Sequence, residues 1–120
     1  MKLTEAKELL KAEVLTKSPW EEVEVKSACG SDLMSDVLAF VKDQALLLTG
    51  LVNPQVIRTA EMMDIKVLVF VRGKRPSDDM IELADSMGIV MLTTEYPLYI
   101  ACGKLYKNGL GGRGGEADGR

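Results

Sequence analysis

Three cations lie close together in the loop at residues 72–77, which reads Arg-Gly-Lys-Arg-Pro-Ser. An apolar run precedes this loop, and a segment with helical spacing of its apolar residues follows it. A helix N-terminus offers free N–H groups and the positive end of the helix dipole, and nearby cations add to their attraction for an anion. These features together suit an anionic ligand. The alternative is a solvated turn whose charges keep an acidic chain soluble.

Further candidate ligand residues follow the ends of the neighbouring apolar runs. In open α/β sheets, ligands bind outside the carboxyl ends of the parallel strands. If the apolar runs are such strands, the residues that follow them share one rim of the sheet. The predicted ligand-binding residues are Gly50, Asn53, Arg72, Gly73, Lys74, Thr93 and Thr94.

The side chains that usually carry catalysis or bind metals are scarce. The chain has no histidine, and Cys29 and Cys102 form no C-x-x-C pair, so buried free thiols are the favoured interpretation. Asp32, Asp36 and Glu95 offer carboxylates for acid–base chemistry, but nothing fixes their separation, and a helix cap explains Asp32 better. We therefore expect no enzymatic activity, no cofactor and no metal.

Two glycine-containing segments resemble nucleotide-binding motifs without meeting their requirements. Residues 109–114 match G-x-G-x-x-G, but a dinucleotide fingerprint follows a strand and opens a helix, whereas this segment follows a helix and opens nothing. Residues 49–54 join an expected strand to an expected helix. They lack the Gly-Lys-Ser/Thr of a phosphate-binding loop, so a triphosphate site is not predicted there.

Three short apolar runs, at residues 45–49, 67–71 and 89–92, must position the rim. Nearly continuous apolar runs are typical of strands with both faces covered, and parallel pairing requires crossover helices between them. The sequence therefore predicts an α/β fold with a mostly parallel β-sheet flanked by helices.

Helix signals separate these runs. Asn53 followed by proline starts the first helix, and Ser77 caps the second, which ends at Gly88. A last helix is expected from about residue 96 to 107, with Pro97 in its first turn.

The first 44 residues give weaker signals. We expect a short helix at 4–11 with Thr4 as its N-cap, a brief strand at 13–15 and a half-exposed strand at 22–26, where apolar and charged residues alternate. A helix should follow, capped by Ser31 or Asp32. Its expected apolar stripe is Leu33, Val37, Leu38 and Val41.

Length and composition predict one domain at residues 1–108 and a disordered, glycine-rich tail at 109–120. The formal net charge of −3 argues against nucleic acid as the main partner. No segment is apolar for long enough to cross a membrane, and the N-terminus has no signal core, so a cytoplasmic location is expected.

The last expected helix carries a stripe formed by Tyr99, Gly103 and Tyr106. These residues are either ordinary boundary residues or a surface on which a second chain approaches closely at the glycine. The second interpretation predicts a homodimer.

Four segments together resemble the DRTGG domain family. They are residues 30–37 (Gly-Ser-Asp-Leu-Met-Ser-Asp-Val), 48–50 with the following Asn53-Pro54, 67–73 with Pro76, and 101–106 (Ala-Cys-Gly-Lys-Leu-Tyr). The likeness spans roughly residues 1–108 and is greater to the small stand-alone members. The family takes its name from the residues Asp-Arg and Thr-Gly-Gly. In this sequence, Asn-Pro at 53–54 stands near the expected position of Asp-Arg, and Arg-Gly-Lys at 72–74 stands near that of Thr-Gly-Gly.

This resemblance implies the fold of the HPr kinase N-terminal domain. Family members occur as accessory domains of phosphotransacetylases and of pyrophosphatases with CBS domains, where regulatory or oligomerising roles without catalysis are implied. The stand-alone members are often encoded beside iron-only hydrogenase and redox genes, with kinase-like ATPase and phosphatase partners.

Three hypotheses follow. The first is a non-catalytic regulatory and oligomerisation domain that binds a small anionic ligand such as a nucleotide. The second is a pure protein–protein interaction module that acts with redox- or hydrogenase-associated or kinase-type partners. The third, a small phosphotransferase, lacks an identifiable nucleophile with an adjacent base.

Overall fold

A five-stranded sheet forms the centre of the computed structural model, which describes residues 1–40 and 45–111. Its order is β1-β5-β4-β3-β2. The strands are β1 (Glu13–Val14), β2 (Ser27–Gly30), β3 (Ala45–Thr49), β4 (Val67–Phe70) and β5 (Val90–Thr93). Strands β2 to β5 are parallel, and β1 pairs with β5 in the antiparallel direction. The predicted mostly parallel α/β fold is confirmed.

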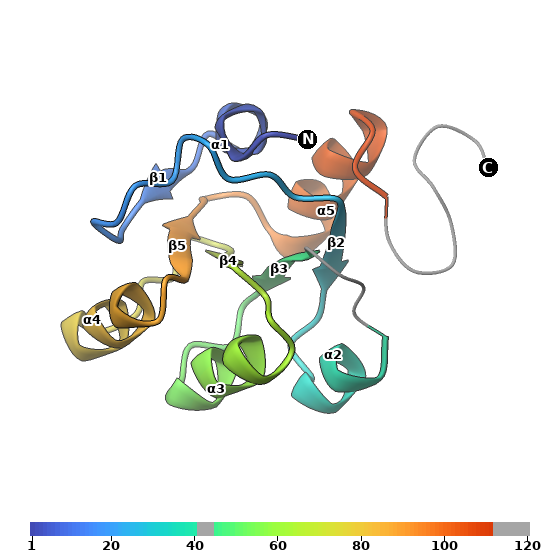
Figure 1. Cartoon of the computed structure of the whole chain (residues 1–120). Coiled ribbons are helices and arrows are strands. Elements are labelled where there is room, and N and C mark those ends of the chain that lie inside the picture. The colour runs from blue at the N-terminus through green and yellow to red at the C-terminus, as the bar shows by residue number, and fades with distance from the viewer. Residues whose placement is uncertain (41–44, 112–120) are drawn as a thin grey trace.

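Helices cover both faces of this sheet (Figure 1). The helices are α1 (Leu3–Leu10), α2 (Met34–Phe40), α3 (Pro54–Met62), α4 (Asp78–Ser86) and α5 (Leu98–Lys107). One core cluster holds buried residues of α1 and α5, and the other holds buried residues of α2, α3 and α4. The domain therefore has three layers, helix, sheet and helix.

The central strands are buried along their whole length. In β4, Val67 and Val69 belong to the cluster on the α1/α5 face, whereas Leu68 and Phe70 belong to the cluster on the opposite face. Successive side chains of a strand point to opposite faces. Because both faces are covered, both sets are apolar, which accounts for the uninterrupted apolar runs.

The predicted starts of α3 and α4 are confirmed. The Asn53 side-chain oxygen accepts a hydrogen bond from the Gln55 N–H at 2.9 Å, and the Ser77 hydroxyl accepts one from the Met80 N–H at 3.3 Å. Gly88 follows α4 with a φ of 73°, a left-handed conformation that glycine adopts without steric cost. Local capping chemistry therefore fixes where both helices begin.

The strand predicted at 22–26 is wrong, because the edge strand β2 lies at Ser27–Gly30 instead. The alternating segment pairs with the N-terminus: the Leu3 N–H donates to the Val23 carbonyl at 2.8 Å, and the Val25 N–H donates to the Met1 carbonyl at 2.9 Å. The small residues of β2 allow α5 to lie close above it. A short run of small residues gives no apolar alternation, so the pattern did not identify it.

Two predictions about α1 and α2 also need correction. The N-cap of α1 is Lys2, not Thr4, and no side chain caps this helix. Leu33, which precedes α2, and Leu38 within it are 58% and 44% exposed, whereas Met34 and Val37 are buried. The apolar face is therefore rotated from the predicted one, because α2 is short and its sequence holds apolar residues on more than one side. Val41 lies outside the described residues.

The C-terminal boundary extends beyond residue 108. Leu110 is 3% exposed and belongs to the core cluster, and the Gly111 carbonyl accepts a hydrogen bond from the Ala28 N–H of β2 at 2.8 Å. Residues 109–111 therefore complete the fold rather than starting the expected tail. The rest of that tail, residues 112–120, lies outside the described part of the chain.

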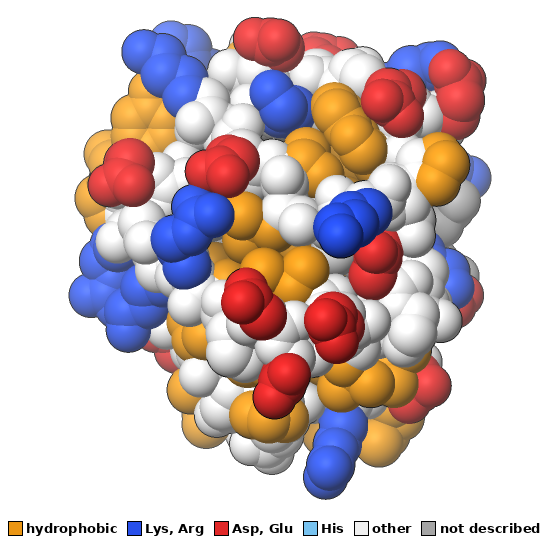
Figure 2. Space-filling view, turned by 90° about the vertical axis from the view of Figure 1, so that its left-hand side faces the viewer, with side chains coloured by type: hydrophobic (Ala, Val, Ile, Leu, Met, Phe, Trp, Pro, Cys, Tyr) orange, Lys and Arg blue, Asp and Glu red, His pale blue; other side chains and the backbone are white. Residues whose placement is uncertain are grey.

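Acidic and basic side chains are intermixed on the face shown in Figure 2, with apolar side chains between them. No continuous basic surface of the kind that follows a nucleic-acid backbone covers this face. Within residues 1–40 and 45–111, no helix has both the length and the apolar character needed to span a membrane.

Candidate functional site

The carboxyl ends of β3, β4 and β5 meet at one edge of the sheet because these strands are parallel neighbours. The loops that follow β4 and β5 are joined through the main chain. The Gly73 N–H donates to the Thr94 carbonyl at 2.8 Å, and the Arg72 N–H donates to the Tyr96 carbonyl at 2.9 Å. The structure therefore brings together the backbone of the predicted rim.

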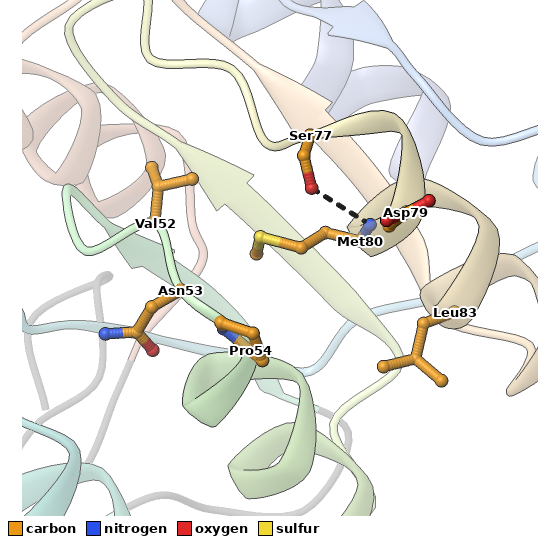
Figure 3. Close-up of a pocket in the computed structure, with 7 residues that line it drawn as sticks. All are labelled: Val52, Asn53, Pro54, Ser77, Asp79, Met80 and Leu83. Atoms are coloured by element: carbon orange, nitrogen blue, oxygen red, sulfur yellow. Dashed lines mark hydrogen bonds between the residues drawn. The ribbon is translucent and has the colours of Figure 1, made fainter.

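A groove of about 510 Å³ opens between the starts of α3 and α4. It is lined by Val52, Asn53, Pro54, Ser77, Asp79, Met80 and Leu83. Figure 3 shows the Met80 side chain reaching from α4 towards the β3–α3 loop, while the Asn53 amide points away from α4. Both caps are engaged with their own helices, so the groove offers mainly apolar surface, with the carboxylate residue Asp79 among its lining residues.

An acidic and a basic side chain share the space over Gly50, at the end of β3. The Asp32 Oδ1 atom accepts hydrogen bonds from the Gly50 N–H at 2.6 Å and from the Thr49 hydroxyl at 3.2 Å. The Arg72 Nη2 atom lies 3.0 Å from the position that a Cβ of Gly50 would take. The expected helix-capping role of Asp32 is therefore wrong, since its carboxylate contacts β3 instead.

A second carboxylate lies at the next rim glycine. Gly73 has a φ of 69°, and a Cβ at this position would lie 2.7 Å from the Glu95 Oε2 atom. Its neighbour Arg72 also has a positive φ, of 58°. Both the left-handed backbone and the adjacent carboxylate explain why glycine stands at residue 73.

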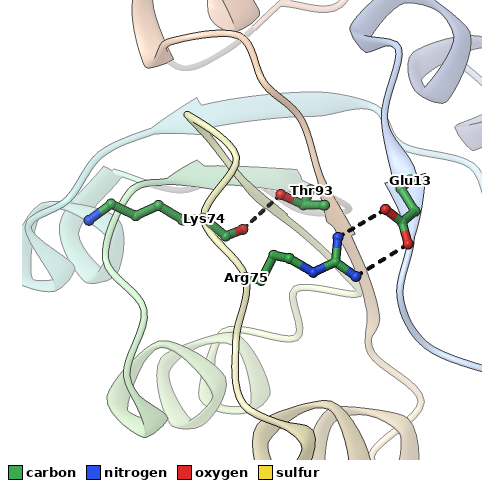
Figure 4. A network of polar contacts seen from close by, with 4 residues as sticks. All are labelled: Glu13, Lys74, Arg75 and Thr93. Atoms are coloured by element: carbon green, nitrogen blue, oxygen red, sulfur yellow. Dashed lines mark hydrogen bonds and ion pairs between the residues drawn. The ribbon is translucent and has the colours of Figure 1, made fainter.

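The three cations of the basic loop have different partners. Arg75 forms a two-pronged ion pair with Glu13 of β1, at 2.9 Å and 3.3 Å, and this pair lowers the pKa of Glu13 below its usual value. Figure 4 shows the Lys74 side chain pointing away from Arg75. Arg72 and Lys74 are exposed, and no ion pair joins either of them to another described residue.

The two predicted threonines are used internally. The Thr93 hydroxyl donates to the Lys74 carbonyl at 2.7 Å, and the Thr94 hydroxyl donates to the Leu10 carbonyl at 2.7 Å (Figure 4 for the former). Thr94 is only 2% exposed. They therefore hold the loops in place beneath the rim. Of the predicted ligand residues, Arg72 and Lys74 are exposed at the rim and Gly73 is partly exposed, whereas Gly50 is buried beneath them and Asn53 lines the groove.

The sequence did not identify Met80 and Leu83 as lining residues, although Ser77, three positions before Met80, was recognised as a cap. A capping residue that follows a strand could have identified Met80, because the residue one turn into such a helix lies near the carboxyl end of the sheet. Val52 and Pro54 line the other side of the groove. Whether they face α4 across a groove depends on the distance between α3 and α4, which a single sequence does not reveal.

The stripe predicted as a dimer surface lies on the outer side of α5. Tyr99 is 85% and Tyr106 50% exposed, and nothing lies within 4 Å of the position that a Cβ of Gly103 would take. Ile100 extends this surface and is 41% exposed. Beside it, the Lys104 ammonium lies 4.9 Å from the centre of the Tyr96 ring.

Both thiols are half-buried, and burial raises the pKa of Cys29 and of Cys102 above the usual value. A raised pKa leaves less thiolate at neutral pH, so neither is an activated nucleophile. Among the described residues, no three histidine, cysteine, aspartate or glutamate side chains are placed to share a metal ion.

No protein-family model matches the chain, and no curated protein matches it in sequence. Among solved structures, the chain is similar to the CBS and DRTGG domains of the regulatory region of Clostridium perfringens pyrophosphatase. That protein was solved in complex with its activator, diadenosine tetraphosphate. The TM-score is 0.73 and the sequence identity is 18%.

The alignment covers 87% of this chain and 45% of the pyrophosphatase chain, so this chain spans less than half of that regulatory region. At this identity the likeness is one of fold. It supports a DRTGG-like fold, in agreement with the resemblance found in the sequence.

Proposed function

We propose that this chain is a DRTGG-type regulatory domain that binds a small anionic ligand such as a nucleotide at the carboxyl rim of its sheet. One observation carries the proposal. The loop that presents Arg72 and Lys74 to solvent ends at Ser77, which lines the groove between α3 and α4. An apolar groove next to exposed cations suits a ligand with a flat base and a phosphate.

The solved relative supports the choice of ligand class. Its regulatory region was crystallised with a dinucleotide activator. This chain corresponds to less than half of that region, so the activator can bind to the part that this chain lacks. We therefore choose nucleotides as probes for this chain.

A non-catalytic role is consistent with the side chains at the rim. Asp32 lies beside Gly50 and Glu95 beside Gly73, and the cysteine pKa values are raised. The sequence contains no histidine that could act as a general acid or base. The proposal includes a cytoplasmic location, where such nucleotides are abundant.

Removing both solvent-facing cations should abolish most of the ligand's effect on stability. We expect the thermal midpoint of the protein to rise with AMP, ATP, pyrophosphate or diadenosine tetraphosphate. In the double variant Arg72→Ala, Lys74→Ala, binding should weaken by at least about tenfold, since a hydrogen bond to a charged group contributes roughly 1.5–3 kcal/mol. A thermal-shift titration measures both effects.

The matched control is Lys66→Ala, which removes an exposed cation that pairs with Asp64 just before β4, at the opposite end of the sheet. Its response to each ligand should equal that of the unmodified protein. A response that survives in the double variant, or no response to any of the four ligands, would contradict the proposed function.

The exposed surface of α5 favours a second role, namely homodimerisation or docking of a protein partner, including a redox-associated or kinase-type protein. Tyr99 and Tyr106 flank Gly103, where a second backbone can approach closely. We expect sedimentation analysis to find a dimer that dissociates in the Gly103→Trp variant. Met62→Trp places the same bulk on an exposed site of α3 and should leave the dimer intact. A monomer at high concentration would contradict the homodimer.

A further inference from the structure

The carboxylate of Asp32 is held by an unusual set of donors for a surface side chain. Although Asp32 is exposed, its Oδ1 atom accepts a 2.6 Å hydrogen bond from the Gly50 N–H and a 3.2 Å hydrogen bond from the Thr49 hydroxyl. Both donors lie at the carboxyl end of β3, in the middle of the parallel part of the sheet. Hydrogen bonds to an ionised acceptor are shorter and stronger than those between neutral groups, whether the acceptor is a side-chain carboxylate or a phosphate.

The absence of a side chain at Gly50 makes this arrangement possible. Gly50 is not among the glycines with a positive φ, so its backbone conformation does not require glycine. A Cβ would lie 3.0 Å from the Arg72 Nη2 atom and 3.4 Å from both carboxylate oxygens of Asp32. The glycine therefore leaves room for a guanidinium and an anion to lie over the end of β3.

Anchoring of the β2–α2 loop does not account for the position of Asp32. The Ser31 N–H already donates to the Leu48 carbonyl of β3 at 3.0 Å, and the Ser31 hydroxyl accepts a hydrogen bond from the Leu33 N–H at 3.0 Å. The loop is thus attached to β3 and shaped locally by the residue before Asp32. Asp32 adds a negatively charged carboxylate that accepts hydrogen bonds from the two neutral donors at the end of β3.

A main-chain N–H, a hydroxyl and a guanidinium are the donors that proteins use for phosphate and carboxylate groups. We propose that the Gly50 N–H and the Thr49 hydroxyl, with the Arg72 guanidinium nearby, form an anion subsite. The carboxylate of Asp32 occupies its two neutral donors until a ligand's phosphate displaces it. Because Asp32 is exposed, it swings out to solvent without disturbing the core. This inference rests on the proposed function and specifies which donors receive the ligand's anionic group.

Inorganic pyrophosphate is the probe that tests the subsite, because it carries phosphate without a base. Its affinity is measured by calorimetry for the unmodified protein and for Asp32→Asn, Asp32→Ala and Asp36→Asn. Asparagine retains a side-chain oxygen for the Gly50 N–H but loses the charge, and alanine removes the competitor altogether. Asp36→Asn makes the same charge change in the first turn of α2 and serves as the control.

We expect Asp32→Ala to bind pyrophosphate about tenfold more tightly, which corresponds to a subsite that is free of Asp32 for about a tenth of the time. Asp32→Asn should fall between alanine and the unmodified protein, and Asp36→Asn should leave the affinity unchanged. The amide resonance of Gly50 should shift on addition of pyrophosphate, which locates the bound anion. Binding by Asp32→Ala alone, with none by the unmodified protein, would equally support an internal competitor.

Two other outcomes separate the possible failures. If the unmodified protein binds pyrophosphate but Asp32→Ala and Asp32→Asn bind it equally or more weakly, Asp32 is no competitor and this inference fails, while the proposed function stands. If neither the unmodified protein nor any variant binds pyrophosphate or a nucleotide, both fail. Circular dichroism of each variant excludes misfolding as the cause, and Asp32→Asn, which keeps the shape of the side chain, provides the decisive value if Asp32→Ala is unfolded.

Discussion

Replacing Phe70 with alanine is expected to lower the free energy of unfolding by about 3–5 kcal/mol, the range measured for large-to-small changes at buried aromatic residues. Phe70 is fully buried in β4, on the face of the sheet that α2, α3 and α4 cover. The substitution removes apolar contacts and leaves a cavity. A domain of this size has roughly 5–15 kcal/mol of total stability, so the variant should be close to unfolding at physiological temperature. Urea denaturation measures the change.

Met62→Ala is the control for this prediction, because Met62 is also a large apolar residue but is 72% exposed on α3. Its free energy of unfolding should change by less than about 0.5 kcal/mol. Equal effects of the two substitutions would mean that the face beneath α3 and α4 is not packed as described.

A methyl group at residue 30 is expected to destabilise the domain by about 1–3 kcal/mol, the usual range for overpacking. Gly30 ends β2 beneath α5, and a Cβ there would clash with the Cys102 Sγ atom and lie 3.3 Å from the Leu98 Cδ1 atom. Either the cysteine must rotate or α5 must move away from the sheet. Thermal or urea denaturation of Gly30→Ala tests this contact.

Two companion variants identify the cause. In the double variant Gly30→Ala, Cys102→Ala, the loss should be smaller than the sum of the two single losses, since the clashing sulfur is gone. Gly103→Ala adds a methyl group to α5 where nothing lies within 4 Å, and it should stabilise a monomeric sample by roughly 0.5–1 kcal/mol. Additive effects in the double variant would show that α5 does not lie against β2 in this way.

The sequence predicted the part of the fold in which local chemistry and burial agree. Strands β3, β4 and β5 are uninterrupted apolar runs because helices cover both faces, and Asn53 and Ser77 mark the starts of the crossover helices by capping them. These signals depend on a few neighbouring residues, so they can be recognised without knowledge of the tertiary structure.

The edges of the fold were harder to predict because their structure depends on distant contacts. Strand β2 consists of small residues that pair with β3 on one side. The Ala28 N–H of this strand also donates a hydrogen bond to the carbonyl of Gly111, some 80 residues further along the sequence. Nothing in the local pattern encodes either contact. The alternating residues 22–26 gave a stronger local signal, but their main chain pairs with the N-terminus.

The common edge of the sheet at which the candidate residues lie was predicted, but their contacts with one another were not. Parallel strands imply a common carboxyl rim, and this correctly brought Gly50, Arg72 and Gly73 to one edge of the sheet. The inward hydroxyl of Thr94 and the engagement of Arg75 by Glu13 depend on α1 and β1, whose positions relative to the rim the sequence did not reveal. The same is true of Asp32, whose contact with Gly50 joins two separate loops.

A crystal structure of the protein grown with diadenosine tetraphosphate tests the central proposal most directly. We predict density for a base in the groove between α3 and α4, and for a phosphate within hydrogen-bonding distance of Arg72 or Lys74. Density for the nucleotide on another surface, or a bare rim in a sample that binds the nucleotide in solution, would contradict it.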